Sequence, residues 1–469
     1  MKGRTATLAL GVVLALACAP VFSPVFAFAR AAEPNIVFLF TDDNDTYTLN
    51  RAMPNVVNRI GGQGATFENA TFAQSLCCPN RASMQRGQYP HNTGVMKNHP
   101  PYGGFRVFKN RGHHLDTYAT DVKAQGYSTA YVGKYMNGYE DFPGTVPGGW
   151  DLWRSGRPMA DCFSANGDKR CGDYGPARHD AWVNGTALPW IGAKAAEETP
   201  YLAVLSYYNP HAPCEHPSSY DQLFAGERLP PRASFNEADV SDKPAWIRRL
   251  PRLTRAEKVA LVSANRCRLR SAAFTDDLIG EVLDAVDASG EPTYVVFWND
   301  NGYHLGQHRL QTQDKGGKAT PYIEDVRFPL MVRGPDIAPA QKRSELINSV
   351  DLRPTLAEMA GGSSPAYADG ESFLPLARGL AVPWRAFTYT EAPINTEVYS
   401  GIPPYKAVYT QTTSYHLWTN SGEQEFYDLL LDPFQLESRP LDSRVGAHKD
   451  ALSSYSGCAA ETCREAGGP

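Results

Sequence analysis

The stretch NIVFLFTDD, from Asn35 to Asp43, decides the fold that this sequence predicts. Its apolar residues run continuously from Ile36 to Phe40 instead of alternating with polar ones, and they are mostly β-branched or aromatic. This pattern is typical of a strand that is buried on both faces, as in a parallel sheet. The run ends in Thr41, Asp42 and Asp43, so we expect the strand to deliver two carboxylates to its carboxyl end.

Three later segments repeat this design of an apolar strand that ends in polar residues. They are STAYVGKY (Ser128–Tyr135), YLAVLSYYNPH (Tyr201–His211) and TYVVFWNDNG (Thr293–Gly302). Between the last two, Ala256–Gly290 has apolar residues at helical spacing and a terminal glycine, which predicts one long helix or two consecutive ones. The alternation of strands and helices predicts an α/β fold with a mostly parallel sheet flanked by helices.

A change of composition between Gly361 and Trp384 predicts a boundary. Beyond it, the β-rich segments YKAVYTQ, SYHLWTN and EQEFYDL, with a turn at Ser421-Gly422, predict a small antiparallel sheet. The expected division is a leader over residues 1–31, a main α/β domain over 32–365 and a C-terminal β-rich subdomain over 366–469.

The N-terminus predicts export. Lys2 and Arg4 precede an apolar run, and Ala29-Arg30-Ala31 offers small residues for a signal peptidase. We therefore expect a secreted, periplasmic or cell-surface protein. An uncleaved anchor and a lipid attached to Cys18 are the alternatives. No second apolar run is long enough to span a membrane, so stable membrane insertion is not expected.

The overall charge argues against two classes of partner. The formal net charge is -5, and no block of lysine and arginine interrupts the chain. Nucleic acid and anionic membranes are therefore not expected as partners. Positive charge can still gather locally in a cleft.

Eight cysteines follow the leader, in a compartment where disulfides persist. The candidate pairs are Cys162 with Cys171, Cys458 with Cys463 and Cys214 with Cys267, although sequence does not fix the connectivity. Cys77 and Cys78 remain, and neighbouring cysteines rarely bridge each other. Pro79 suits the first turn of a helix that ends at Gly87, which would place Cys77 just ahead of the helix and Arg81 about one turn on. Such a site favours anions, whereas the alternative is a buried structural cysteine pair.

Ligands collect at the carboxyl ends of strands in open α/β sheets. This rule gathers one set of polar side chains at a single edge: Asp42, Asp43, Lys134, His211, Asp300 and Asn301. The three carboxylates and the amide are hard oxygen ligands, suited to Ca²⁺ or Mg²⁺ more than to zinc. The alternative for each aspartate alone is the cap of a following helix or turn.

The pentapeptide Cys77-Cys78-Pro79-Asn80-Arg81 matches the C-x-P-x-R signature of the type I sulfatases, and the chain resembles that family from residue 34 to about 433. The blocks that carry the resemblance include PNIVFLFTDDND, YVGKYMNGY, YYNPHAP, WNDNGYHLGQH and KATPYIEDVRFPLMVRGP. The resemblance implies an alkaline-phosphatase-like fold with a small C-terminal antiparallel sheet. It also implies that a separate formylglycine-generating enzyme oxidises Cys77 to formylglycine, whose hydrate attacks the sulfur of a sulfate ester and later expels sulfate.

The resemblance also implies roles for individual residues. The divalent cation would be held by Asp42, Asp43, Asp300 and Asn301, and would bind residue 77. Arg81 would steady that residue, Lys134 and Lys318 would neutralise sulfate oxygens, and His211 would donate a proton to the leaving group or hold its oxygen. Lys318 is preferred to Lys315 because it lies four residues before Tyr322, as in the family block.

One feature departs from the pattern of many arylsulfatases, which carry Lys-x-His where this chain has Lys134 and Met136. Asn137 is a candidate replacement for the absent histidine. His304 and His308 could line the substrate cleft, although turn or core roles are equally open.

The motifs resemble the N-acetylglucosamine-6-sulfatase and glycan 6-sulfatase branch, which implies a 6-O-sulfated amino sugar in a glycan as substrate. The alternatives are a phosphodiesterase or phosphonate monoester hydrolase of the same superfamily, an inactive glycan-binding relative, and a secreted domain that calcium merely stabilises.

Overall fold

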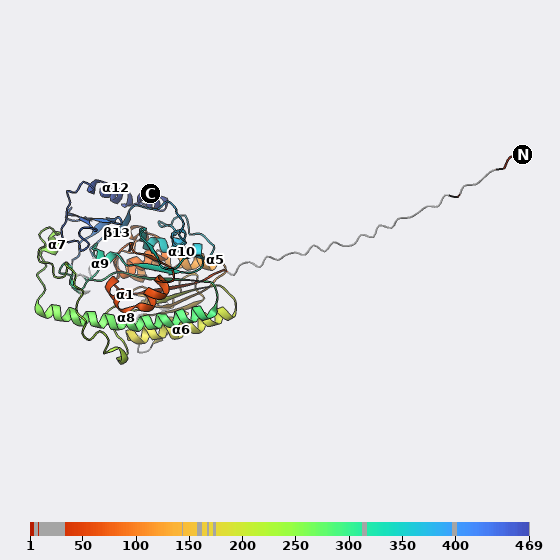
Figure 1. Ribbon diagram of the computed structural model, residues 1–469, viewed down its shortest axis with the longest axis horizontal. Coiled ribbons are helices and arrows are strands. Elements are labelled where there is room, and N and C mark those ends of the chain that lie inside the picture. The colour runs from red at the N-terminus through yellow and green to blue at the C-terminus, as the bar shows by residue number, and fades with distance from the viewer. Residues whose placement is uncertain are drawn as a thin grey trace. The chain divides into compact units, whose positions relative to one another are not determined.

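The structure is a computed structural model that describes residues 1–3, 8, 33–142, 144–156, 162–166, 168–171, 175–311, 317–395 and 401–468. The chain divides into two units, Met1–Ala32 and Glu33–Pro469. Most of the expected leader, including Cys18, lies outside the described residues, and every described helix and strand belongs to the second unit (Figure 1). Among the helices that are described, none combines the length and the apolar character needed to cross a bilayer.

A ten-stranded sheet forms the centre of this unit, in the order β11-β2-β10-β9-β1-β8-β4-β5-β6-β7. The five strands β9-β1-β8-β4-β5 run parallel, whereas β10 and β6 are antiparallel to their neighbours in that group. Every residue of β1, β8 and β9 is buried, as their continuous apolar runs predict. The prediction of an α/β fold with a mostly parallel sheet is confirmed.

The strands of the main sheet are β1 Asn35–Thr41, β2 Ala65–Phe67, β4 Ser128–Gly133, β5 Leu152–Gly156, β6 Cys162–Ala165, β7 Asp168–Cys171, β8 Tyr201–Ser206, β9 Thr293–Asn299, β10 Leu330–Arg333 and β11 Gln341–Arg343. The remaining strands are β3 Ala70–Thr71, β12 Ile347–Asn348, β13 Thr388–Ala392, β14 Tyr405–Tyr409, β15 Thr413–Trp418 and β16 Gln424–Asp428. The α-helices are α1 Thr46–Ala52, α2 Cys77–Arg86, α3 Pro90–Thr93, α4 Gly104–Asn110, α5 Tyr118–Ala124, α6 Pro176–Ala196, α7 Ala245–Arg248, α8 Arg255–Ser289, α9 Ile323–Val326, α10 Leu352–Met359, α11 Leu374–Ala377, α12 Val445–Tyr455 and α13 Glu461–Ala466. A π-helix, η1 Val56–Gly61, and the 3-10 helices η2 His113–Leu115, η3 Tyr139–Asp141, η5 Ser218–Tyr220 and η7 Ser349–Asp351 complete the described elements.

Helix α8 is a single helix of 35 residues, which decides between the two predicted alternatives. Thr254 and Glu257 form a capping box at its start, where the Glu257 backbone N–H donates to Thr254 Oγ1 at 3.2 Å. Gly290 ends the helix with φ of 68°, a left-handed conformation that glycine adopts without strain. Figure 1 shows α8 running alongside α6 on one side of the sheet.

Helix α2 begins at Cys77, so Pro79 lies in its first turn as predicted, but the placement of Cys77 ahead of the helix is wrong. The first turn forms earlier because Asn80 N–H donates to the Leu76 carbonyl at 3.0 Å and Asn98 Oδ1 accepts from Cys78 N–H at 2.9 Å. Cys77 is therefore the first residue of the helix and does not precede it. The end at Gly87, with φ of 66°, is as predicted.

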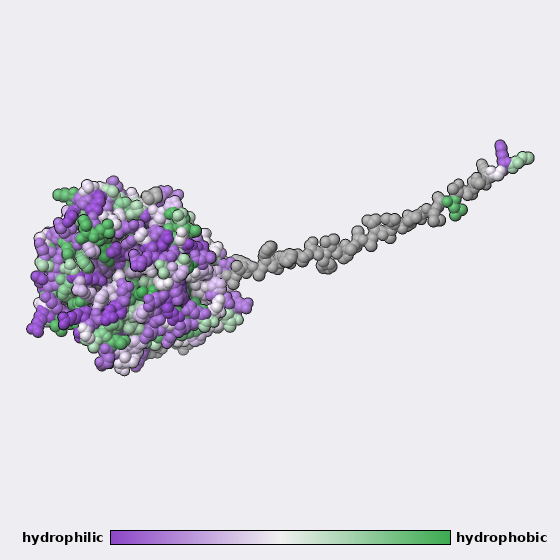
Figure 2. All heavy atoms as spheres, viewed as in Figure 1, coloured by the Kyte–Doolittle hydropathy of each residue, from purple (hydrophilic) through white to green (hydrophobic). Residues whose placement is uncertain are grey.

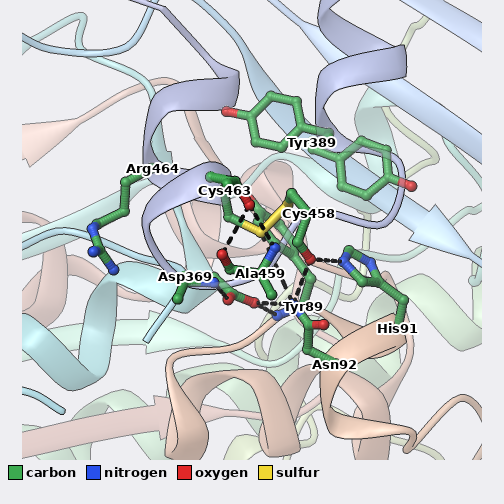
Figure 3. Close-up of a disulfide and its surroundings, with 12 residues drawn as sticks. Tyr89, His91, Asn92, Asp369, Tyr389, Cys458, Ala459, Cys463 and Arg464 are labelled. Carbon is green, nitrogen blue, oxygen red and sulfur yellow. Dashed lines mark hydrogen bonds between the residues drawn. A yellow bond between two sulfur atoms is a disulfide. The ribbon is translucent and has the colours of Figure 1, made fainter. Parts of the chain in front are cut away.

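The C-terminal strands β13-β14-β15-β16 form the predicted four-stranded antiparallel sheet. The Cys458–Cys463 disulfide follows it, and the turn it closes lies against α3 (Figure 3). Cys458 O lies 2.9 Å from His91 Nε2, and Ala460 N–H donates to Asp369 Oδ1 at 2.7 Å. These bonds attach the end of the chain to α3 and to the segment around Asp369.

Two of the three predicted disulfides, Cys214–Cys267 and Cys458–Cys463, are confirmed. Cys162 and Cys171 are register partners across β6 and β7, but their side chains lie outside the described residues. Residues 33–469 form one compact unit, and the expected boundary between residues 365 and 366 stays a prediction.

Candidate active site

The ends of β1 and β9 bring the four predicted oxygen ligands to one place. The parallel register aligns Thr41 with Asn299, so Asp42 and Asp43 emerge beside Asp300 and Asn301, and all four side chains have no exposed surface. Asp43 N–H donates to Asp300 Oδ1 at 3.1 Å, and Asn301 Nδ2 donates to Asp43 Oδ1 at 2.7 Å. Sequence positions almost 260 apart thus form one buried cluster of carboxylates.

Helix α2 points its first turn at this cluster. Cys77 is 1% exposed, and its Sγ lies 3.9 Å from Asp42 Oδ1. Arg81, one turn on, donates from Nε to Asp300 Oδ2 and from Nη2 to Asp42 Oδ2, both at 2.9 Å. Its Nη1 donates to the carbonyl of Lys134 and to Ser206 Oγ. Arg81 therefore connects α2 to the ends of four strands.

Two buried lysines complete the cluster. Lys134 follows β4 and forms an ion pair with Asp42, and Lys318 forms one with Asp43. Lys318 Nζ also lies 3.1 Å from Cys77 Sγ. Lys315 belongs to residues 312–316, which lie outside the described residues, so the choice between it and Lys318 stays a prediction.

His211 lies at the rim of the cluster, 8% exposed, with Nε2 at 3.6 Å from Asp43 Oδ2. Its Nδ1 is 2.5 Å from the Ala212 carbonyl, an acceptor, so Nδ1 carries the proton of the neutral ring. Nε2 is then the nitrogen that takes up a second proton, on the side that faces the carboxylates.

Burial and charge act against each other on these groups. Burial raises the pKa of Asp42, but Lys134, His211 and Arg81 outweigh it and hold this pKa well below its usual value. Burial, followed by the charge of Asp42, raises the pKa of Asp300 to about 6. Burial lowers the pKa of His211 to about 4. The resting site thus combines ionised Asp42 with a neutral imidazole at neutral pH.

The donor set fits a hard divalent cation. Asp43 Oδ2 and Asn301 Oδ1 are buried and have no hydrogen-bond partner among the residues that the structure describes, which is costly for oxygen atoms unless a ligand completes them. Ligand atoms of Asp42, Asp43, Cys77 and His211 all lie within 4.8 Å of one another. Carboxylate and amide oxygens are the ligands of Ca²⁺ and Mg²⁺.

Sequence reasoning missed Arg268, which supports the cluster from outside. This residue of α8 is 4% exposed and donates from Nη2 to the Asp43 carbonyl at 2.6 Å and to Asp45 Oδ2 at 2.9 Å. Its Nη1 lies 3.3 Å from the carbonyl of Pro210, next to His211. The signal was present, because Arg268 occupies a position on the buried face of α8 between Leu261 and Ala272 where an apolar residue is expected.

Three of the predicted substrate contacts stay predictions. His304 has no exposed surface and its Nε2 lies 2.9 Å from Thr320 Oγ1, so it lies behind the Lys318 segment. His308 is also fully buried and stacks on Tyr322. Asn137 is half-buried, and its backbone N–H lies 3.1 Å from Cys78 Sγ.

Comparison with known proteins decides the family. Residues 34–362 match the family described as Sulfatase, and residues 317–451 match the one described as N-sulphoglucosamine sulphohydrolase, C-terminal. The chain belongs to the sulfatase family. The resemblance drawn from the sequence is confirmed.

The similar proteins include arylsulfatases, N-acetylglucosamine-6-sulfatases and extracellular sulfatase homologs. The chain is 32% identical to an arylsulfatase of Volvox carteri over 72% of its own length and 57% of the relative's. It is 30% identical to the human N-acetylglucosamine-6-sulfatase over 77% of its length and 68% of the relative's. The match to the extracellular sulfatase SULF-1 homolog of Drosophila melanogaster, at 31% identity, covers 74% of this chain and 32% of that protein.

Solved structures confirm the fold. A protein in complex with its substrate D-glucosamine-2-N,6-O-disulfate superposes with a TM-score of 0.74 at 20% identity, over 90% of this chain and 96% of that one. A phosphonate monoester hydrolase from Silicibacter pomeroyi gives a TM-score of 0.69 at 18% identity, over 92% and 96% of the two chains.

Proposed function

We propose that this sulfatase hydrolyses a sulfate monoester with formylglycine at position 77. The observation that carries the proposal is the position of Cys77, on the first turn of α2, between Asp42 and Lys318. Export through the leader 1–31 would bring the chain to a formylglycine-generating enzyme before it folds.

The unmodified thiol is poorly suited to be the nucleophile. Burial raises the pKa of Cys77 to about 12, so the sulfur stays protonated at neutral pH even though Lys318 and Lys134 favour the thiolate. An aldehyde hydrate in its place carries two hydroxyl groups. One attacks sulfur, and the other, after losing its proton, releases sulfate by breaking the carbon–oxygen bond.

Asp42, Asp43, Asp300 and Asn301 would hold the cation. A bound Ca²⁺ or Mg²⁺ supplies positive charge that lowers the pKa of a nearby hydroxyl and polarises the sulfate ester. Arg81 fixes the carboxylates of Asp42 and Asp300 relative to α2 through its two 2.9 Å bonds. The orientation of residue 77 thus depends on the same guanidinium.

The remaining side chains handle charge and protons. Lys134 and Lys318 approach the cluster from two sides and would exchange part of their contact with Asp42 and Asp43 for the sulfate oxygens. His211 can take a proton on Nε2, because Nδ1 is bonded to a carbonyl. A bound sulfate ester brings negative charge that raises the pKa of His211, and the resulting imidazolium can protonate the departing alcohol.

For the substrate we propose a 6-O-sulfated amino sugar in a glycan. The support is the identity to N-acetylglucosamine-6-sulfatases, 30% for both the goat and the human proteins. A phosphonate monoester hydrolase would use a similar fold, and turnover of matched sulfate and phosphonate esters separates the two activities. An inactive glycan-binding relative is disfavoured, because the three carboxylates, Arg81 and both lysines are present and in contact.

Mass spectrometry of the peptide that contains residue 77 tests the modification. We expect a mass corresponding to formylglycine at Cys77 and an unmodified thiol at Cys78. Cys77→Ser should fold and lose turnover of glucosamine 6-sulfate by at least a thousandfold. Cys78→Ser is the matched control, because its oxygen can still accept from Asn137 N–H, and it should keep activity within a few fold. Full activity with an unmodified Cys77 thiol would contradict the proposal.

A further inference from the structure

Helix α8 carries a groove lined with cations, beside the loop that holds His216. The groove has a volume of 510 Å³ and is lined by His216, Arg255, Lys258, Val259, Val262, Ser263, Arg266, Cys267 and Arg270. The cations recur at spacings of three, eight and four residues, so they lie on one side of the helix. At a rise of 1.5 Å per residue the row is roughly 22 Å long.

Four cations of this groove have no ion-pair partner within the described residues, although His216 Nδ1 lies 3.5 Å from Asp221 Oδ1 at its edge. Among the described residues, no carboxylate lies within the 4.0 Å ion-pair distance of Arg255, Lys258, Arg266 or Arg270. In the described part of the chain, Arg266 and Arg270 each hydrogen-bond through Nε alone, which donates to the carbonyls of Glu227 and Leu223 at 2.8 Å. Their outer amino groups stay available, in a chain whose net charge is -5. Such a local row of cations attracts a polyanion.

The groove is connected to the active site by one short loop. His211 faces the carboxylate cluster and His216 lines the groove, and five residues can span at most about 18 Å. The Cys214–Cys267 disulfide fixes this loop to the floor of the groove, and Arg268, on the opposite face of α8, holds the loop at Pro210. The groove therefore begins within about 18 Å of His211 along the chain.

We propose that this groove binds the sulfate groups of further sugars in a polymeric substrate, while one sulfated sugar occupies the active site. The proposal rests on the proposed sulfatase function for the identity of its ligand. The positive charge of the groove favours a negatively charged ligand such as a sulfated glycan. Between the cations, Val259, which is 64% exposed, and Val262 offer apolar contacts to sugar rings. The groove would make the enzyme prefer long sulfated chains to single sulfated sugars as substrates.

Binding to the Cys77→Ser protein tests the groove without requiring catalysis. The variant Arg255→Glu/Lys258→Glu changes two side chains that make no ion pair within the described residues. The variant Lys342→Glu/Lys449→Glu changes the net charge equally, on β11 and on α12. With a heparin octasaccharide as probe, we expect the first variant to weaken binding at least fivefold and the second less than twofold. Equal weakening by the two variants would overturn the proposal.

Two further measurements separate the possible failures. In the formylglycine-containing enzyme, Arg255→Glu/Lys258→Glu should raise KM for sulfated octasaccharide and leave kcat/KM for glucosamine 6-sulfate unchanged. If neither the unsubstituted enzyme nor any variant turns over glucosamine 6-sulfate, but binding of the octasaccharide still depends on the groove residues, the proposed function is wrong and the proposed binding groove is supported. If a single-stranded oligonucleotide of the same charge binds as tightly as the octasaccharide, the assignment to glycans is overturned.

Discussion

Arg268 joins three parts of the chain that sequence places far apart. Its guanidinium contacts the Asp43 carbonyl, the Asp45 carboxylate and the Pro210 carbonyl, and lies 4.1 Å from the centroid of the Tyr303 ring. The backbone of Asp43 is in the left-handed region, with φ of 56°, which an aspartate adopts only where its surroundings fix it. Arg268 therefore positions a proposed cation ligand and the loop of His211 together.

Arg268→Lys should impair the site while the fold survives. Lysine keeps the charge but cannot reach two carbonyls and a carboxylate at once, so we expect a loss of about 1 to 3 kcal/mol in the free energy of unfolding. We also expect kcat/KM to fall roughly tenfold or more, and the midpoint of activation by added Ca²⁺ to shift to higher concentration. Arg270→Lys, on the outer face of the same helix, is the control. An unchanged Ca²⁺ midpoint in Arg268→Lys would show that this residue is only structural.

Residues within the site differ in how far sequence could predict them. Cys77 and Arg81 belong to a motif in one short helix, and the aspartates end continuous apolar strands, so local patterns were enough. The contacts of Ser206 and Asn80 were not predictable, because each depends on how elements meet: Ser206 Oγ accepts from Arg81, and Asn80 Nδ2 donates to the Asp300 carbonyl. Such residues are ordinary polar positions until the tertiary structure selects their partners.

At the scale of elements, α8 also caps a neighbouring helix. Asp276 is 1% exposed, and its carboxylate accepts from the backbone N–H groups of Asn55 and Val56, at 2.9 and 3.0 Å, at the start of η1. Burial raises the pKa of Asp276 to about 6, although these bonds favour the ionised form. The folded protein therefore binds this proton more strongly than the unfolded chain does.

The stability contribution of Asp276 should depend on pH in a defined direction. This contribution is fully present below the pKa of 3.8 in the unfolded chain, and it is lost as the pH rises through the folded-state pKa of about 6. The loss in unfolding free energy is at most about 3 kcal/mol. We expect Asp276→Asn to reduce the fall in unfolding free energy between pH 4 and pH 7, measured by urea denaturation. Asp450→Asn, an exposed position on α12, is the control. Equal slopes in the wild type and Asp276→Asn would contradict this assignment.

Element boundaries show why local sequence was sufficient for α8 and insufficient for α2. The capping box at Thr254 and the glycine at 290 mark both ends of α8 in the sequence itself. The start of α2 instead depends on Asn98, which accepts from Cys78 N–H although it lies 20 residues away. A bond between residues so far apart cannot be predicted from a local sequence pattern. In the folded protein it helps to extend the helix so that Cys77 is its first residue.

At the scale of the whole molecule, the sheet topology explains why the site forms. The apolar runs predicted the parallel strands, but their order does not follow from them, and only the order β9-β1-β8-β4 places Asp300, Asp42, His211 and Lys134 side by side. Hydrophilic residues predominate on the face shown in Figure 2, and apolar residues form scattered patches there. The carboxylates, by contrast, are all in the interior, where their repulsion has to be balanced by Arg81, the lysines or a cation.

This balance predicts how the whole fold responds to metal. Removing the cation from the purified protein with a chelator should lower Tm, and adding Ca²⁺ at a hundredfold excess over its Kd should restore about 2.7 kcal/mol of stability. Asp300→Asn should abolish activity and the Ca²⁺ response while costing little stability in chelator, because it removes one of three mutually repelling carboxylates and keeps an acceptor for Arg81. Asp450→Asn, on α12, should respond to Ca²⁺ like the wild type. Two results would contradict a Ca²⁺ or Mg²⁺ site at these oxygen ligands. One is a rise of Tm with Ca²⁺ that persists in Asp300→Asn, and the other is Zn²⁺ found by metal analysis in protein purified without chelator.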